Sequence, residues 1–201
     1  MAITKSYANY LGDKITEQQF NNLTDSQINY YENNLIIKTE HFEGDKIILY
    51  TIYTDDQVKI PSILNEYPGK VDVIVRSFSA QYRIEELFNY NNSILYNNSK
   101  HIYDQKNNLL CDQYYDLLGD IKFESTEKYL YDGDEELFAL AFSYKSDGSV
   151  NSIWGTWVFN TDQGQKGSIY DGNILTYFPT LFIDHPYYQN ATPFLPNSPT
   201  V

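Results

Sequence analysis

Hydrophobic and polar residues alternate with a period of two through most of the chain. Val71, Val73 and Val75 alternate with other residues in one segment, and Phe138, Leu140, Phe142 and Tyr144 alternate with small residues in another. Successive side chains of a strand point to opposite faces of a sheet, so this period predicts strands with one buried face. Residues 46–54 are instead apolar on both alternating faces, which predicts a central strand covered on both sides.

Short polar turns separate these segments. Each turn follows a tyrosine or phenylalanine, contains Asp, Asn or Gly, and leads into an aliphatic residue; examples are residues 31–36, 42–48, 103–110, 131–138 and 170–175. Asp, Asn and Gly tolerate the positive backbone angles of tight hairpins. We therefore expect successive antiparallel hairpins, with a β-meander over residues 103–159.

Helix signals are few. Thr16 and Gln19 have the spacing of a capping box, which predicts a short helix ending near Leu23, and Pro61 allows one or two further helical turns. Residues 80–90 fit a strand or a short helix equally well. We expect residues 89–99 to form a loop interrupted by a short apolar run.

The fold class that follows is mainly β. We expect an antiparallel meander sheet, arranged as a sandwich or an open barrel, with one or two short helices. A chain of 201 residues is long enough for one β-rich domain covering 1–201. Residues 1–26 would form a lead-in with a short helix, and the proline-rich residues 176–201 an extended tail laid over the surface. In the strand expected at 121–131, Lys122, Glu124 and Lys128 would face water.

Acidic residues outnumber basic ones, and the formal net charge is −13 with a pI near 4.5. Over residues 104–147, eleven acids against four lysines give −7, so more than half of the excess falls in the meander. This charge argues against nucleic acid or an anionic membrane as a partner, and favours a basic partner or simple solubility. The 20 tyrosines reflect either compositional bias or anchors for a protein partner.

The single cysteine, Cys111, excludes an internal disulfide and suits a reducing compartment. Its apolar neighbours indicate an inert thiol in a strand. No apolar run has the length of a signal peptide or of a membrane span. We therefore expect a cytoplasmic protein.

No arrangement of residues matches a catalytic or metal-binding template. His41, His101 and His185 have no ligand spacing, and the acids at 132–136 lack the alternation of a calcium loop. Glu85 and Glu86 could supply a carboxylate pair, but no spacing singles them out. We expect no enzyme activity, cofactor or metal.

A β-barrel or sandwich that binds or processes a small ligand remains the alternative. It would be a lipocalin-like protein or a carboxylate-dependent hydrolase. Gly155 and Trp157 match the Gly-x-Trp signature of lipocalins, although that signature lies near the N-terminus in the family. A deep apolar pocket with a few convergent polar groups would favour this alternative.

The recurring segments 31–36, 42–47, 103–110 and 131–137 resemble the tyrosine-aspartate hairpin repeats of bacterial polymorphic-toxin systems. Small acidic proteins of this texture resemble the immunity proteins of those systems. The resemblance covers about half of the chain and is one of composition and period. It implies a protein that binds and blocks a cognate, basic toxin.

We expect the partner to bind the solvent side of the meander and its turns. Acids would steer a basic partner and tyrosines would anchor it. The alternative is that the turn acids only solubilise an exposed hairpin. The predicted partner-binding residues are Asp112, Tyr114, Tyr115, Asp116, Glu124, Tyr129, Tyr131, Asp132, Asp134, Glu135 and Glu136.

Overall fold

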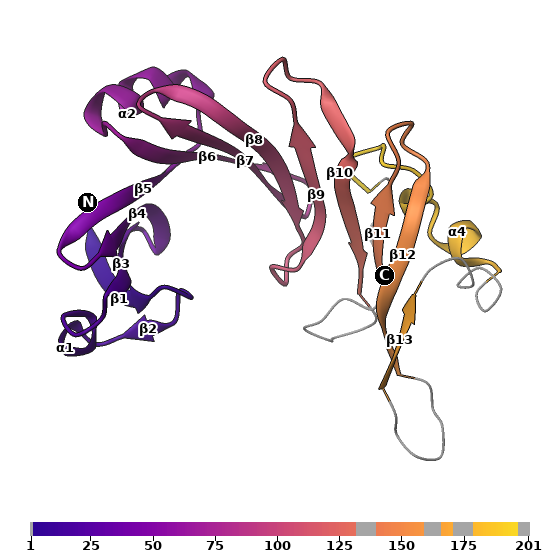
Figure 1. Cartoon of the computed structure of the whole chain (residues 1–201), viewed down its shortest axis with the longest axis horizontal. Coiled ribbons are helices and arrows are strands. Elements are labelled where there is room, and N and C mark those ends of the chain that lie inside the picture. Colours follow the sequence, from indigo (N-terminus) through magenta and orange to yellow (C-terminus); the bar gives the residue numbers. More distant parts are fainter. Residues whose placement is uncertain (1, 132–139, 159–165, 171–178, 197–201) are drawn as a thin grey trace. The chain divides into compact units, whose positions relative to one another are not determined.

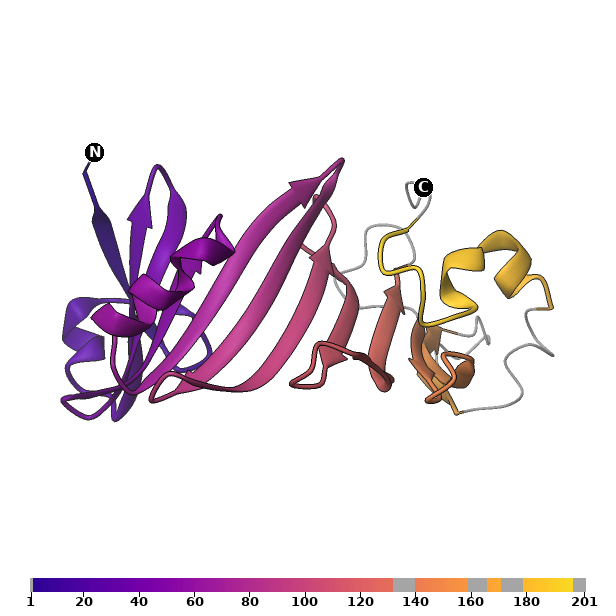
Figure 2. The same ribbon diagram turned by 90° about the horizontal axis from the view of Figure 1, so that it is seen from above.

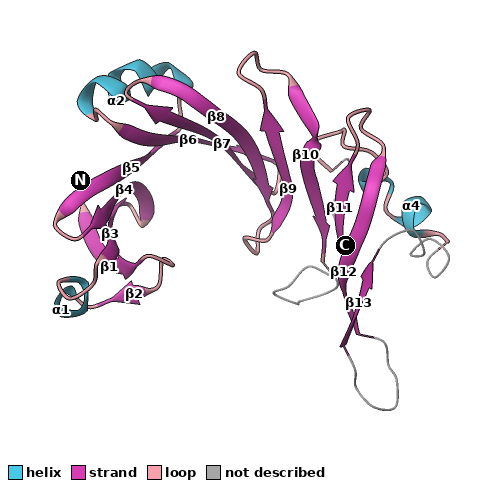
Figure 3. Ribbon diagram, viewed as in Figure 1, coloured by secondary structure: helices cyan, strands magenta, loops and turns pink. Residues whose placement is uncertain are grey.

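A computed structural model describes residues 2–131, 140–158, 166–170 and 179–196. These residues form a mainly β structure with a few short helices, which confirms the predicted fold class (Figure 3). The described strands hydrogen-bond to one another in the order β13-β12-β11-β10-β9-β8-β7-β6-β5-β4-β3-β1-β2 (Figure 1). Strands β5 and β6 pair in parallel, whereas the pairs β1–β2, β1–β3, β3–β4, β4–β5, β9–β10, β10–β11, β11–β12 and β12–β13 are antiparallel.

The elements have the following bounds. The strands are β1 (Thr4–Asn9), β2 (Lys14–Ile15), β3 (Asp25–Glu32), β4 (Leu35–Glu43), β5 (Lys46–Thr54), β6 (Lys70–Ser79), β7 (Tyr82–Asn91), β8 (Ile94–Tyr103), β9 (Leu109–Tyr115), β10 (Ile121–Leu130), β11 (Leu140–Tyr144), β12 (Val150–Val158) and β13 (Lys166–Tyr170). The helices are α1 (Glu17–Phe20), α2 (Ile60–Glu66) and α4 (Leu181–Asp184), with 3-10 turns η1 (Gln57–Lys59) and η2 (Pro186–Tyr188).

Contacts between residues divide the chain into two compact units. Unit 1 comprises Met1–Ser77 and Glu85–Asn98, and unit 2 comprises Phe78–Ile84 and Ser99–Val201. Each unit has hydrophobic clusters of its own.

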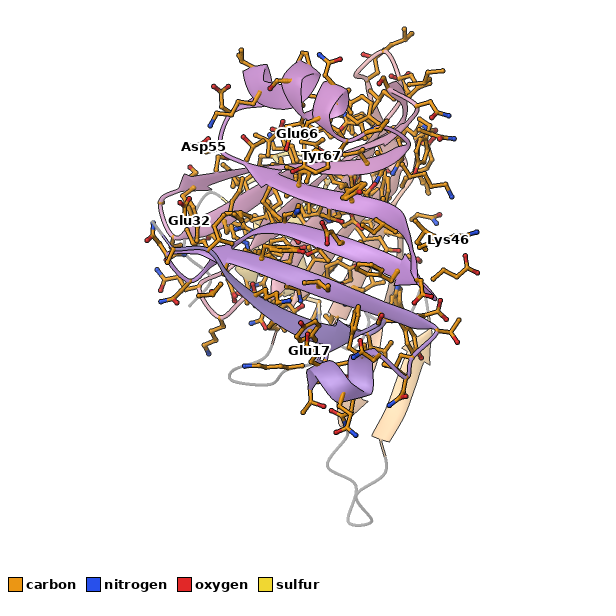
Figure 4. The ribbon with its side chains drawn as sticks, turned by 90° about the vertical axis from the view of Figure 1, so that its left-hand side faces the viewer. Glu17, Glu32, Lys46, Asp55, Glu66 and Tyr67 are labelled. Carbon is orange, nitrogen blue, oxygen red and sulfur yellow. The ribbon has the colours of Figure 1, made fainter. Side chains whose placement is uncertain are left out.

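The core of unit 1 lies between helix α2 and the strands beside it (Figure 2). Ile60 of α2 packs with Ile52 of β5 and with Val71 and Val73 of β6. Tyr67, labelled in Figure 4, follows α2, and its ring centroid lies 4.9 Å from that of Tyr50. The helix is the crossover that a parallel strand pair requires, and it covers the face that carries the valines.

The predicted hairpins and helices of unit 1 are present. Asn33 and Asn34 form the β3–β4 turn with positive φ angles, and Gly44 does so between β4 and β5. Thr16 caps α1 in a capping box with Gln19. The predicted central strand has the bounds of β5, but the expectation that it is covered on both sides is wrong for its first residues, because Ile47 and Ile48 are 38% and 47% exposed.

The loop predicted at residues 89–99 is wrong, because this segment contains the end of β7 and the start of β8. Asn92 and Ser93 have φ angles of 48° and 63°, as the central residues of a two-residue hairpin require. Asparagine adopts this left-handed conformation more readily than most residues. The polar sequence that suggested a loop therefore encodes a tight turn between two strands.

The C-terminal segment supplies part of the core of unit 2. Leu181, Tyr187, Tyr188 and Ala191 are buried against strand residues that include Phe142. The hydroxyl of Tyr188 donates to the carbonyl of Tyr129, and that of Tyr144 donates to the carbonyl of Tyr188. The prediction of an extended tail on the surface is therefore wrong for the described part of this segment, which contains α4 and η2 and is packed as core.

Strand β10 contains an irregularity that reverses its alternation. Tyr114 pairs with Lys122, but Asp112, two residues earlier on β9, pairs with Glu127, so β10 carries extra residues between these pairs. Such a bulge changes which residues face the core. Lys128, predicted to face water, is 0% exposed.

Candidate functional site

One face of the sheet in unit 2 carries acids and aromatic residues. Asp112 of β9 pairs with Glu127 of β10, which pairs with Ser143 of β11, which in turn pairs with Ser152 of β12. Directly paired residues point to the same side, as do residues two apart in a regular strand. We call this surface the acid–tyrosine face; it consists of Asp112, Tyr114, Glu127, Tyr129, Ser143, Ser152 and Trp154.

The two faces of these strands differ in burial. Cys111, Lys128 and Phe142 alternate with residues of the acid–tyrosine face and are completely buried. Members of the acid–tyrosine face are instead partly exposed, and Trp154 is 39% exposed. The acid–tyrosine face is therefore partly accessible to solvent, and its side chains also shield one another.

Tyrosines and carboxylates are in contact on this face. The hydroxyl of Tyr129 donates to Glu127 Oε2 at 2.5 Å. Nδ1 of His101, on β8, lies 3.4 Å from Asp112 Oδ1, close enough for an ion pair when the imidazole is protonated. Since Asp112 and Glu127 are directly opposite across two strands, the two carboxylates also repel each other.

Burial and the paired charges alter the proton affinities of these groups. Burial raises the pKa of Asp112; the positive charge of His101 opposes this shift and the negative charge of Glu127 adds to it. Burial, followed by the nearby Asp112 carboxylate, raises the pKa of Tyr114. The pKa of Tyr129 is raised by burial and by its hydrogen bond to Glu127. The tyrosines therefore stay protonated as donors.

The predicted partner-binding residues are divided by the structure. Asp112, Tyr114 and Tyr129 lie together on the acid–tyrosine face. The hydroxyl of Tyr115, the neighbour of Tyr114, donates to the buried Gln113. Tyr131 packs against the cluster of Tyr82, Ile102, Leu110 and Cys111, and its hydroxyl donates to the carbonyl of Leu109.

The predicted acids have different surroundings. Asp116 forms the β9–β10 turn, because its Oδ1 accepts from the backbone N–H groups of Leu118 and Asp120. Glu124 is exposed within the irregular part of β10. Asp132, Asp134, Glu135 and Glu136 lie outside the described residues.

Sequence reasoning missed four members of the face: Glu127, Ser143, Ser152 and Trp154. Glu127 precedes Tyr129 by two residues, which places both on one side of a regular strand, but regular alternation from Ile121 made that side the core side. The position of the bulge determines which side of β10 faces the core. Trp154 reaches the same face through its pairing with Ala141.

Lys128 does not offset the surface acids of unit 2. Its ammonium donates to the carbonyl oxygens of Tyr187, Asn190 and Pro193 at 2.9, 2.8 and 2.9 Å. It also lies 3.8 Å from the centroid of the Tyr187 ring. Lys128 is one of the four lysines in residues 104–147. Because the C-terminal segment encloses it, it does not neutralise the surface acids.

Unit 1 has a polar sheet face of its own. Asn89 Nδ2 donates to Asp72 Oδ1 at 2.6 Å, and Asn97 Nδ2 donates to Asn89 Oδ1 at 2.8 Å. Arg76 and Glu85 form an ion pair at 2.9 Å. These hydrogen bonds satisfy the polar groups that the sheet partly buries, so we assign this network to the fold.

A cavity of about 340 Å³ lies beside β1. Its lining is mixed in polarity and comprises Thr4, Lys5, Ser6, Ala8, Gly12, Lys14, Asn29, Tyr31 and Asn34. It differs from the deep apolar pocket that a lipocalin-like protein would need. The side chain of Trp157, on which that alternative drew, is outside the described side chains.

The histidines and the cysteine have ordinary surroundings. Burial lowers the pKa of His41, whose Nε2 lies 3.0 Å from Thr51 Oγ1. His185 packs edge-on against Tyr188. Burial raises the pKa of Cys111 to about 12, which keeps it a thiol. In the part of the chain that the structure describes, no three His, Cys, Asp or Glu side chains are grouped to hold a metal ion.

Comparison with protein-family models, with curated proteins and with solved structures gave no match to this chain. Among the described helices, none has the length and apolar character that crossing a bilayer requires.

Proposed function

We propose that the chain is a binding protein that recognises a basic protein partner through the acid–tyrosine face of unit 2. The resemblance to immunity proteins suggests that this partner is a bacterial toxin, which the chain blocks in the cytoplasm. The observation that carries the proposal is the direct opposition of Asp112 and Glu127 on a partly exposed sheet face.

Two carboxylates that face each other across a strand pair lower the stability of the folded state. Like charges directly across a strand pair destabilise a sheet, by an amount on the order of 0.2–1 kcal/mol. Burial of Asp112 adds to this cost by disfavouring its charged form. A lysine or arginine of a partner would relieve the repulsion, so the same arrangement favours a complex with a cation.

The aromatic residues of the face suit an anchor. Tyr114, Tyr129 and Trp154 are stiff, large and partly exposed. Tyrosine and tryptophan are enriched among residues whose truncation weakens protein complexes most. Because the hydroxyl of Tyr129 bonds to Glu127, its ring is held before a partner arrives, which reduces the entropy lost on binding.

The test is binding to the protein encoded by the neighbouring gene, measured by surface plasmon resonance at low and moderate salt. The variant is Asp112→Asn with Glu127→Gln. We expect its affinity to fall about tenfold or more, with a slower, less salt-dependent association.

The matched control is Asp25→Asn with Glu43→Gln, because these acids are also directly opposite across two strands but are exposed in unit 1. We expect this control to bind as the wild type does. Equal affinities for the wild type and both variants would remove the acid–tyrosine face from consideration.

A further inference from the structure

Among the described residues, four five-residue turns share one architecture. They are residues 9–13, 104–108, 116–120 and 145–149. In each, the N–H of the first residue donates to the carbonyl of the fifth, and the N–H of the fourth donates to the carbonyl of the first. The fourth residue has a positive φ, 91°, 71°, 91° and 81° in chain order.

The first residue fixes three of these turns through its side chain. Asn9 Oδ1 accepts from two backbone N–H groups of its turn, and Asp104 Oδ1 and Asp116 Oδ1 do the same in theirs. Backbone geometry therefore depends on positions one and four. The backbone N–H of the third residue is one of the two donors, but the side chains of the second and third residues take no part in these bonds. These three turns therefore leave the residue types at both positions open.

The chain itself shows that polar residues suit the second and third positions. Gln105 and Lys106 occupy them in one turn, and Ser146 and Asp147 in another. The turns at 9–13 and 116–120 instead present apolar side chains: Tyr10 and Leu11 are 72% and 68% exposed, and Leu117 and Leu118 are 63% and 89% exposed. Of these two tips, the second joins β9 and β10, which carry the acid–tyrosine face. Since the turn does not require apolar side chains, exposing two adjacent leucines suggests a contact with another molecule.

We propose that Leu117 and Leu118 insert into an apolar pocket with a basic rim on the partner protein. The inference rests on the proposed function, because the same strands, β9 and β10, carry the acid–tyrosine face. Asp116 and Asp120 flank the leucines, so the tip combines an apolar centre with a negative border. The partner's cations would meet that border while its pocket removes the leucines from water.

Charge at the turn distinguishes a protein from a lipid surface. Backbone hydrogen bonds from its own turn lower the pKa of Asp116, so this carboxylate stays ionised at neutral pH. Anionic lipids would repel it. A pocket with a basic rim attracts it instead, in agreement with the overall charge of −13.

The experiment replaces both leucines, Leu117→Gln with Leu118→Gln, which changes no charge and keeps the residues that form the turn. The probe is the protein encoded by the neighbouring gene. We expect its complex to dissociate faster and its affinity to fall about tenfold or more. Circular dichroism and the unfolding midpoint should match those of the wild type.

The matched control is Tyr10→Gln with Leu11→Gln, which alters the apolar tip of the same turn type in unit 1 and should leave affinity unchanged. If the leucine variant binds within twofold of the wild type while the Asp112→Asn and Glu127→Gln variant does not, the tip contact is overturned and the proposed function stands. If the wild type does not bind this protein, both fail. Leucine-dependent binding to phosphatidylcholine vesicles would assign the tip to lipid and overturn the protein contact.

Discussion

Replacing Lys128 by methionine should destabilise unit 2. Methionine keeps most of the side-chain length but removes the ammonium that donates to the carbonyls of Tyr187, Asn190 and Pro193. Losing the partner of a buried acceptor costs roughly 2 kcal/mol, so three carbonyls cost at most about 6 kcal/mol. The bond to Tyr187 is buried, whereas those to Asn190 and Pro193 are partly buried, so water can replace part of what these two carbonyls lose.

Removal of a buried charge offsets part of this cost. Burial lowers the pKa of Lys128 from 10.5 to about 8. At about 1.4 kcal/mol per pKa unit, the difference corresponds to about 3 kcal/mol of desolvation that methionine does not incur. The expected net loss in the free energy of unfolding is therefore up to about 3 kcal/mol.

Urea unfolding at pH 7, followed by tryptophan fluorescence, measures this loss, because Trp154 lies in β12 of unit 2. The matched control is Lys122→Met on the same strand, where the side chain is exposed; it should change stability by less than about 0.5 kcal/mol. A Lys128→Met variant as stable as this control would refute the reasoning.

The pH dependence gives a second check on Lys128. Its folded-state pKa is lower than its unfolded-state pKa, so the unfolded chain binds more protons between pH 8 and 10.5. The lysine contribution to wild-type stability should therefore rise with pH in that window, by up to about 1.4 kcal/mol per unit, and stay constant below it. The gap to the methionine variant should widen from pH 8 to 10; a constant gap would contradict the lowered pKa.

Three further outcomes are expected. Asp112→Asn alone should raise the thermal midpoint at pH 7 slightly, because it removes a partly buried charge opposite Glu127; a lower midpoint in differential scanning fluorimetry would contradict the repulsion. Burial raises the pKa of Tyr30 and of Tyr67 to about 12, so above pH 10 the folded state retains protons that the unfolded state releases, and the stability should fall. Absorbance at 295 nm should show tyrosines that titrate well above pH 10. Complete titration of the folded protein near pH 10 would contradict this. Gly119→Ala should cost about 1–2 kcal/mol in urea unfolding, because its φ is +91°, although no atom of the described residues beyond its chain neighbours lies within 4 Å of the added Cβ. An unchanged midpoint would show that the turn relaxes.

The strands of this chain are largely predictable from local pattern, because hairpin turns and alternation are local properties. Residues 46–54 and the Thr16 capping box illustrate this, since their structure depends on neighbours in sequence. The β7–β8 hairpin escaped prediction because Asn92 and Ser93 occupy a left-handed turn within a polar segment that also fits a loop.

The candidate site was less predictable, because it depends on long-range pairing. The bulge before Glu127 determines that this acid faces Asp112 and that Lys128 faces the core. No local pattern specifies the length of the bulge. The destination of Lys128 depends further on carbonyl groups of Tyr187, Asn190 and Pro193, which the strand sequence does not reveal.

The enclosure of Lys128 also has a consequence during synthesis. The three carbonyls that receive its ammonium belong to residues 59, 62 and 65 positions later. At roughly 5–20 residues per second, a ribosome needs about 3–13 s to add them. Every residue of unit 1 precedes Ser99, so its core can form before this interval ends, whereas the Phe142 side of unit 2 is still without Leu181 and Tyr188. Until those residues emerge, that apolar side is the part of the nascent chain to which a chaperone would bind.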